Sequence, residues 1–169
     1  MKDKTLLLLF SCLCIILSSF NFYYSESQSS RIEYETFLNT IPEKDRDCIV
    51  ENYQKIELCL IETFSKEWYD DLCEQDKASN HRFYFHIITN SQGKILSIEK
   101  DKLFKGMTQY EFEQFAISFK RNYDVCIFPP RGSTLQEFKA KYGNRLPFSF
   151  LYFPSKTRTF LEEWRLNNG

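Results

Sequence analysis

The sequence predicts a small α+β protein, with a helical N-terminal segment followed by a small antiparallel sheet and one packed helix. Apolar residues recur every three or four positions between Arg31 and Lys77, which is typical of amphipathic helices. Two strand-like runs then flank a turn at 90–93, and a capped aromatic helix and a Phe-rich run follow. A chain of 169 residues has room for one ordinary domain.

The composition excludes several classes of protein. The chain has 22 basic and 23 acidic residues, which gives a formal net charge of -1. Proteins that bind nucleic acid or anionic membranes through bulk charge are far more basic, so no nucleic-acid partner is expected. Aromatic residues make up 17% of the chain, which is enough for a compact core.

Residues 1–27 have the layout of a secretory signal peptide. Lys2 and Lys4 precede an apolar stretch at 6–20, and positions 25–27 offer small residues for cleavage. The apolar stretch is shorter than the roughly 20 residues that a membrane span needs. We therefore expect export and cleavage, with membrane contact only if this segment is retained as an anchor.

Residues 31–78 are predicted to be a helical segment. Six apolar side chains recur with helical spacing along one face: Ile49, Tyr53, Ile56, Leu60, Phe64 and Trp68. Pro42 separates an earlier short helix that contains Tyr34 and Leu38. Neither Gly nor Pro interrupts 43–76, so one long helix and two pieces joined at 65–67 both remain open.

Export changes the interpretation of the cysteines. Four remain after removal of residues 1–27: Cys48, Cys59, Cys73 and Cys126. An even number in an oxidising compartment indicates disulfides, with three complete pairings possible, and buried apolar thiols are the alternative. On one continuous helix, Cys48 and Cys59 would lie about 16 Å apart, beyond the ~7 Å that a disulfide tolerates. Their pairing would require a helix that begins near Cys59.

Residues 79–156 are predicted to form the α+β domain, after a polar boundary at 74–80. The runs 82–89 and 94–98 have strand composition, and Gly93 supplies the positive φ of the turn between them. Thr108 and Glu111 then form a capping box that opens a helix. One face of this helix should pack on the sheet: Phe112, Phe115, Ala116, Phe119 and Tyr123.

Proline and glycine residues mark the ends of the remaining elements. Pro129 and Pro130 stop the run after this helix, and 133–143 has the pattern of one or two helical turns closed by Gly143. The last strand is predicted at 146–153 and is stopped by Pro154. Residues 157–169 are assigned to a C-terminal tail.

No catalytic, cofactor or metal site is predicted. The chain has no phosphate-binding loop, nucleophile elbow or C-x-x-C pair, and His81 and His86 are not spaced for zinc. His86 lies in an apolar run, which favours a packed strand histidine over a general base. Nothing around Cys126 singles it out as a nucleophile. The adjacent acidic pairs at 70–71 and 162–163 would diverge on a helix and so form no carboxylate dyad.

Binding is better motivated than catalysis. The edge strand of a small sheet offers unpaired amide and carbonyl groups to an extended peptide. The last strand is the candidate edge, with four aromatic residues: Phe148, Phe150, Tyr152 and Phe153. The alternative is that these side chains belong to the core.

Four segments carry a resemblance to a known protein family: the run "FYFHIITNSQGKILSIE", the helix "TQYEFEQFAISFKRN", then "FPP" and "YGNRLPFSFLYF". The region from about 82 to 153 resembles the C-terminal domain of TonB-type energy transducers. The resemblance implies a two-layer sandwich. Upstream, "DCIVENYQKIELCLIETFSKEW" is similar to a Cys-bearing segment of some exported TonB-like proteins, which implies a Cys48–Cys59 bond. The chain departs from the family in the insertion "RGSTLQEFKAKY", in the turn at 143–146, in the tail and in the absence of a Pro-rich spacer.

We therefore expect an exported, non-enzymatic, TonB-C-like domain of the periplasm or cell envelope that binds a protein or peptide. The resemblance implies an outer-membrane receptor or its plug segment as the partner. A secreted accessory or inhibitor domain is the alternative. A small hydrolase that uses Cys126 or His86 is the third hypothesis.

Overall fold

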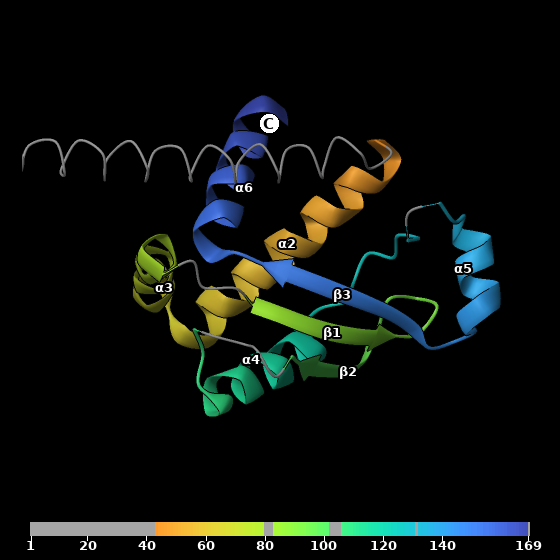
Figure 1. Cartoon of the computed structure of the whole chain (residues 1–169), viewed down its shortest axis with the longest axis horizontal. Coiled ribbons are helices and arrows are strands. Elements are labelled where there is room, and N and C mark those ends of the chain that lie inside the picture. Colours follow the sequence, from red (N-terminus) through yellow and green to blue (C-terminus); the bar gives the residue numbers. More distant parts are fainter. Residues whose placement is uncertain (1–42, 80–82, 102–105, 131, 169) are drawn as a thin grey trace, which may run out of the picture. The chain divides into compact units, whose positions relative to one another are not determined.

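The computed structural model describes residues 43–79, 83–101, 106–130 and 132–168. The predicted signal peptide, the earlier short helix with Tyr34 and Leu38, and His81 lie outside these residues. The described chain runs α2, α3, β1, β2, α4, α5, β3 and α6 (Figure 1). A small antiparallel sheet with helices confirms the predicted α+β class.

The helical segment consists of two helices, α2 at Glu43–Phe64 and α3 at Lys66–Ser79. Ser65 joins them with a backbone φ of 117°, a value that residues other than glycine rarely adopt. Its backbone N–H still donates to the Ile61 carbonyl, and its hydroxyl accepts the N–H of Trp68. Of the two alternatives left open by the sequence, the structure has two helices joined at 65, because Ser65 closes one helix and caps the next.

Three strands form the sheet: β1 at Phe83–Thr89, β2 at Ile95–Lys100 and β3 at Leu146–Tyr152. Their order is β2-β1-β3, and β1 pairs with both neighbours in antiparallel register. The hairpin predicted from the turn at 90–93 is therefore present. A register shift after Ile88 places an extra residue in β2, which is how a β-bulge forms.

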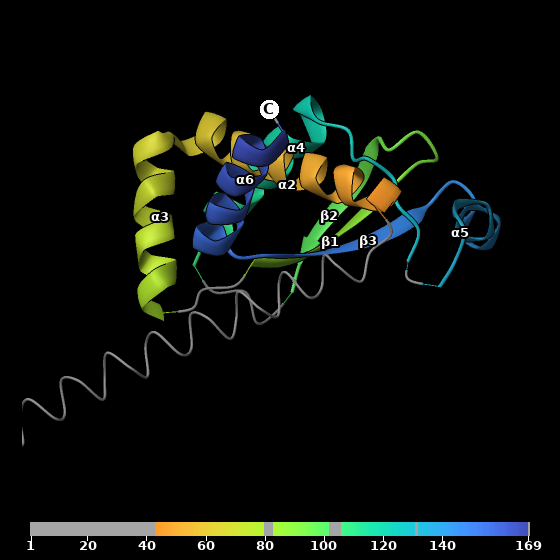
Figure 2. The same cartoon turned by 90° about the horizontal axis from the view of Figure 1, so that it is seen from above.

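The sheet buries one face against helices. Side chains alternate between buried and more exposed positions along β1 and β3, so every second residue faces the core. Figure 2 shows α2, α4 (Gln109–Asn122) and α6 (Pro154–Asn168) on one side of the sheet. The predicted capping box of α4 is present, and Phe112, Phe115 and Phe119 are its buried face. The protein is a two-layer sandwich whose other sheet face carries no helix among the described residues.

Two helices occupy the C-terminal third of the chain. The short helix α5 (Leu135–Tyr142) ends at Gly143, as predicted, and begins at a second capping box that was not predicted. Residues 157–168, which were assigned to a tail, belong instead to the helix α6. This helix begins at Pro154, because proline fits the first turn of a helix. Residues 43–169 form one compact unit, so the helical segment and α6 belong to the same domain as the sheet.

Replacing Gly93 by alanine should destabilise the hairpin severely. Its φ is +89°, and an added Cβ would lie 2.1 Å from the Val125 carbonyl oxygen. Gly132 has a similar φ of +82°, but a Cβ added there would meet no atom within 4 Å, so Gly132→Ala isolates the conformational cost. We expect a loss of about 1 kcal/mol for Gly132→Ala and at least about 3 kcal/mol for Gly93→Ala in urea unfolding. Equal losses would show that the contact with Val125 is unimportant.

Candidate functional site

The candidate peptide-binding edge lies on β3, an outer strand of the sheet. Three of its four candidate aromatic side chains share one face of the strand, and that face is the core, which was the alternative interpretation. Phe148, Phe150 and Tyr152 are 6%, 3% and 0% exposed. Phe153 is half-buried beneath the Lys156 ammonium, which lies 4.9 Å from the ring centroid. These aromatic rings fix the strand in place and leave its backbone as the group that a peptide could pair with.

The outward backbone groups of β3 alternate with those bonded to β1. The Leu151 carbonyl oxygen accepts a hydrogen bond from the Tyr53 hydroxyl at 3.1 Å, so it points away from β1. By the alternation of antiparallel ladders, the backbone of Pro147 and Ser149 points the same way. Pro147 has no N–H to offer. The outward edge is therefore short and centres on Ser149.

His86 lies on the open face of the sheet, where it is exposed. The prediction of a packed strand histidine is wrong, because the alternation along β1 places Phe85 and Ile87 in the core and His86 outside. Its Nδ1 lies 2.9 Å from the Ser149 hydroxyl. Glu99 is opposite His86 on β2, so glutamate, histidine and serine form one cross-strand row. The row has the residue types of a hydrolase triad, but it lies on the open face of the sheet, and none of its residues lines either of the two hollows described below.

The predicted bond between Cys48 and Cys59 is wrong. Both residues lie on α2, which is continuous from Glu43 to Phe64, and Cys48 is instead bonded to Cys126. The Cα atoms of Cys48 and Cys126 are 5.3 Å apart, inside the range of a disulfide. A sulfur held in this bond is no free nucleophile, which contradicts the hypothesis of a hydrolase acting through Cys126.

The other two cysteines are buried thiols. Burial raises the pKa of the Cys59 thiol, and it raises the pKa of the Cys73 thiol to about 11. A thiol in this state carries little thiolate at neutral pH and is chemically inert. The alternative of small apolar side chains is confirmed for these two residues.

A buried tyrosine pair joins α3 to β3. The hydroxyl oxygens of Tyr69 and Tyr152 lie 2.6 Å apart, and both residues are 0% exposed. Burial raises the pKa of both phenols well above the ordinary value, so both remain neutral hydroxyls. The Arg158 guanidinium lies 4.5 Å from the centroid of the Tyr69 ring and completes this junction from α6.

Acidic residues of α2 and α3 hold α6 along its length. Three contacts do this: Asp76 accepts the Ser155 N–H at 3.0 Å, Asp70 accepts from Arg158 at 2.6 Å, and Glu57 accepts from Arg165 at 2.8 Å. None of these contacts was expected from the sequence, because residues 157–169 were assigned to a tail. Thr157 and Leu161, four residues apart, are both fully buried, but only Leu161 is apolar, so the spacing of apolar residues gave little signal for this helix. These three contacts fix α6 against α2 and α3.

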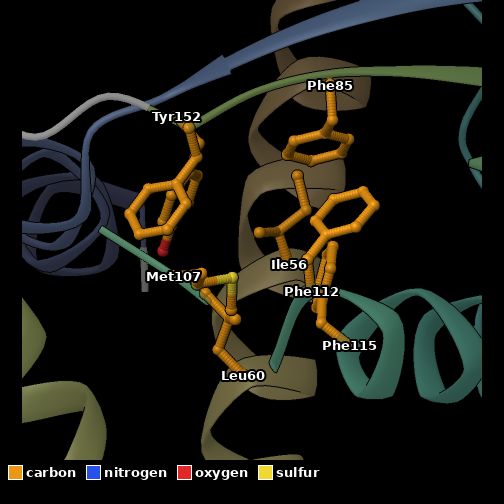
Figure 3. Close-up of a pocket in the computed structure, with 8 residues that line it drawn as sticks. Ile56, Leu60, Phe85, Met107, Phe112, Phe115 and Tyr152 are labelled. Atoms are coloured by element: carbon orange, nitrogen blue, oxygen red, sulfur yellow. The ribbon is translucent and has the colours of Figure 1, made fainter. Parts of the chain in front are cut away.

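The core contains a small apolar cavity, shown in Figure 3. Its volume is about 10 Å³, and it is lined by Ile56, Leu60, Phe83, Phe85, Met107, Phe112, Phe115 and Tyr152. A space of this size holds no more than about one water molecule, so it accommodates no cofactor. A second hollow of about 360 Å³ opens at the surface beside Trp68, whose indole N–H donates to Glu111 at 3.2 Å.

No group of three or more His, Cys, Asp or Glu residues suited to a metal ion occurs among the described residues. None of the helices in the described part of the chain is long and apolar enough to cross a membrane. No protein-family model, curated protein or solved structure matches the chain.

Removing the disulfide should destabilise the domain. The bond joins cysteines 78 residues apart in the sequence, and loss of such a cross-link costs roughly 2–5 kcal/mol. We expect Cys48→Ser combined with Cys126→Ser to lower the free energy of unfolding in urea by that amount, while Cys73→Ser lowers it less. Mass spectrometry after alkylation without reductant should find Cys48 and Cys126 unmodified even in denaturant. Labelling of both would contradict the bond.

The tyrosine pair should behave as one unit. Either Tyr69→Phe or Tyr152→Phe leaves a buried hydroxyl without its partner, which costs about 1–3 kcal/mol. The double variant removes both hydroxyls, so its loss should be smaller than the sum of the single losses. Urea unfolding of the three variants forms a double-mutant cycle. Strict additivity would mean that the two hydroxyls are not coupled.

Proposed function

We propose that the chain is an exported, non-enzymatic domain that binds an extended protein segment by adding it as a strand to β3. The observation that carries this proposal is the position of β3 as an outer strand whose backbone at Ser149 points away from β1. The disulfide between Cys48 and Cys126 supports export, because such bonds persist in oxidising compartments.

The edge sets limits on the segment that it binds. Ser149 offers one N–H and one C=O, and Leu151 offers an N–H, while its carbonyl is already held by Tyr53. Pro147 ends the row of donors. Pro147 still offers its carbonyl, so a partner gains about four backbone hydrogen bonds from β3, and its alternate side chains lie beside Leu151 on the open face of the sheet.

The resemblance to the TonB C-terminal domain supports the choice of partner. In this resemblance, β3 corresponds to the last strand of the TonB C-terminal domain, and an outer-membrane receptor or its plug segment is the expected partner. This chain lacks the Pro-rich spacer of the transducers. We therefore propose binding at the envelope rather than transmission of energy across it.

A pair of substitutions at one position tests strand addition. Ser149→Pro removes the outward N–H without removing a bond to β1, and proline already occupies the equivalent outward position at Pro147. Ser149→Ala keeps the N–H and loses only the contact with His86. We expect Ser149→Pro to fold with a stability change of about 1 kcal/mol or less and to lose the partner, while Ser149→Ala retains it.

The readout is a photo-crosslinking amino acid at Leu151 in cells that export the protein. A discrete adduct with an envelope protein is expected, and it should disappear in Ser149→Pro and persist in Ser149→Ala. An adduct that survives Ser149→Pro would exclude the β3 edge. Recovery of the protein in the cytoplasm with Cys48 and Cys126 reduced would refute export.

A further inference from the structure

The helix α5 is the least buried element of the domain. It lies beyond one end of the sheet in both views (Figures 1 and 2), where it follows the coil after α4 and leads into β3. Phe138 is its single buried side chain, at 4% exposed. Most helices of this size are stabilised by packing rather than by propensity, so the structure of α5 needs a separate explanation.

Local contacts hold α5 in place. Its capping box joins the Thr134 hydroxyl to the N–H of Glu137 and the Glu137 carboxylate back to the N–H of Thr134. Phe138 anchors it edge-on to Phe148 with ring centroids 5.6 Å apart. The turn after the helix is fastened by Asn144, whose side-chain oxygen accepts the Ser91 N–H at 2.9 Å. These contacts present the rest of α5 to solvent in a fixed orientation.

Partly exposed apolar and basic groups border Phe138 on α5. Leu135 and Tyr142 are each 39% exposed and, seven residues apart, lie on the same side of the helix. Lys139 follows Leu135 by four residues and so lies next to it on that side, and the Lys141 ammonium is 4.9 Å from the Tyr142 ring centroid. Tyrosine is among the residues enriched at protein interfaces.

The charge of this region differs in sign from that of the whole chain. Between Gly132 and Leu146 there are three basic residues (Lys139, Lys141 and Arg145) and one acidic residue (Glu137), which gives +2, against -1 for the full sequence. Glu137 is already occupied by the capping box. Lys141 and Arg145 are exposed and Lys139 is half-buried, so the region has net positive charge beyond one end of the sheet, where it would favour an acidic partner.

We propose that α5 and the turn after it bind an acidic peptide segment that carries aromatic or aliphatic side chains. Leu135 and Tyr142 contact the apolar side chains, and Lys139, Lys141 and Arg145 pair with the carboxylates. An anionic membrane is a poorer fit. Three basic residues fall below the four to eight that typify lipid-binding clusters, and two half-buried side chains offer little area for insertion.

This surface goes beyond the proposed strand addition. It is formed by side chains of α5, whereas strand addition uses the backbone of β3 at Ser149. Either site can fail while the other is retained, and Ser149→Pro distinguishes them because it leaves α5 unchanged.

The test uses a random copolymer of glutamate and tyrosine as the probe, with polyglutamate for comparison. Fluorescence anisotropy with the mature, oxidised protein should show binding that is stronger for the tyrosine-containing polymer and that weakens as salt rises from about 0.05 M to about 0.5 M. Binding to polyglutamate of equal strength would remove the apolar part of the proposal.

Two matched pairs of variants locate the site. Lys141 and Arg121 are exposed basic residues in the last turn of their helices, so Lys141→Glu and Arg121→Glu change the net charge and the helix dipole interaction alike. Tyr142→Ser is matched by Tyr110→Ser, since Tyr110 is 70% exposed on α4. We expect Lys141→Glu and Tyr142→Ser each to weaken binding about fivefold or more, and the α4 variants to leave it within about twofold.

Equal effects from both members of a pair would overturn the proposal, because they would indicate diffuse attraction rather than a site on α5. Vesicles of equal parts phosphatidylglycerol and phosphatidylcholine provide the competing outcome. Vesicle binding that Lys141→Glu abolishes, without copolymer binding, would assign α5 to membranes instead. Circular dichroism of each variant identifies any loss of folding, and Lys141→Glu keeps the test valid if Tyr142→Ser unfolds.

Discussion

The fold depends on the burial of one face of a three-stranded sheet beneath α2. A sheet of this size is stable only when a hydrophobic face is covered. The covering residues of α2 are 1–6% exposed: Ile49, Tyr53, Ile56 and Leu60. The helix also contacts α3, α4 and α6, so each of these elements is positioned through it. Tyr53 illustrates the link, since its ring packs on Phe150 and its hydroxyl reaches the outward side of β3.

The same helix determines the path of the chain after α4. The side-chain amide of Asn52 donates to the Cys126 carbonyl at 2.9 Å and accepts the Cys126 N–H at 2.8 Å. This pairing aligns 124–128 with the first half of α2, one turn from Cys48. The disulfide between Cys48 and Cys126 therefore links two segments that these hydrogen bonds already hold together. Asn52 is 1% exposed, and its two hydrogen bonds explain why an amide is tolerated in the core.

Local signals in the sequence predicted most of the helices and strands, but the disulfide partner of Cys48 depends on long-range contacts. The spacing of apolar residues predicted α2, and Gly93 and Thr108 predicted the hairpin and the start of α4. The partner of Cys48 depends on how α4 returns to α2, which no local pattern encodes. The predicted Cys48–Cys59 bond was wrong because the family resemblance implied a helix that begins near Cys59, whereas α2 begins at Glu43.

Two further misses have different physical causes. Helix α6 is rich in polar residues, and its buried stripe includes Thr157, so hydrophobic periodicity is weak there. The exposure of His86 depends on which side of β1 faces α2. Alternation predicts that His86 and its neighbours lie on opposite faces, but it does not say which face is covered. That choice is made by packing against α2 and α4.

The protection of the sheet edges bears on how strongly any peptide can bind. On β2 the Leu96 carbonyl accepts from Lys120 at 2.6 Å, and on β3 the Leu151 carbonyl is held by Tyr53 while Pro147 lacks a donor. Such devices prevent unspecific pairing of edges. They also leave only a short row of groups at Ser149, and a few exposed backbone hydrogen bonds give weak affinity because water competes for them.

A partner of this edge therefore needs additional contacts. The chain supplies them next to the start of β3, since α5 ends at Tyr142 and the strand begins at Leu146. A segment that contacts both surfaces would gain affinity from their linkage, because the second contact forms within a complex that already exists. In such a complex the α5 contacts select the composition of the segment, and the β3 edge fixes its direction.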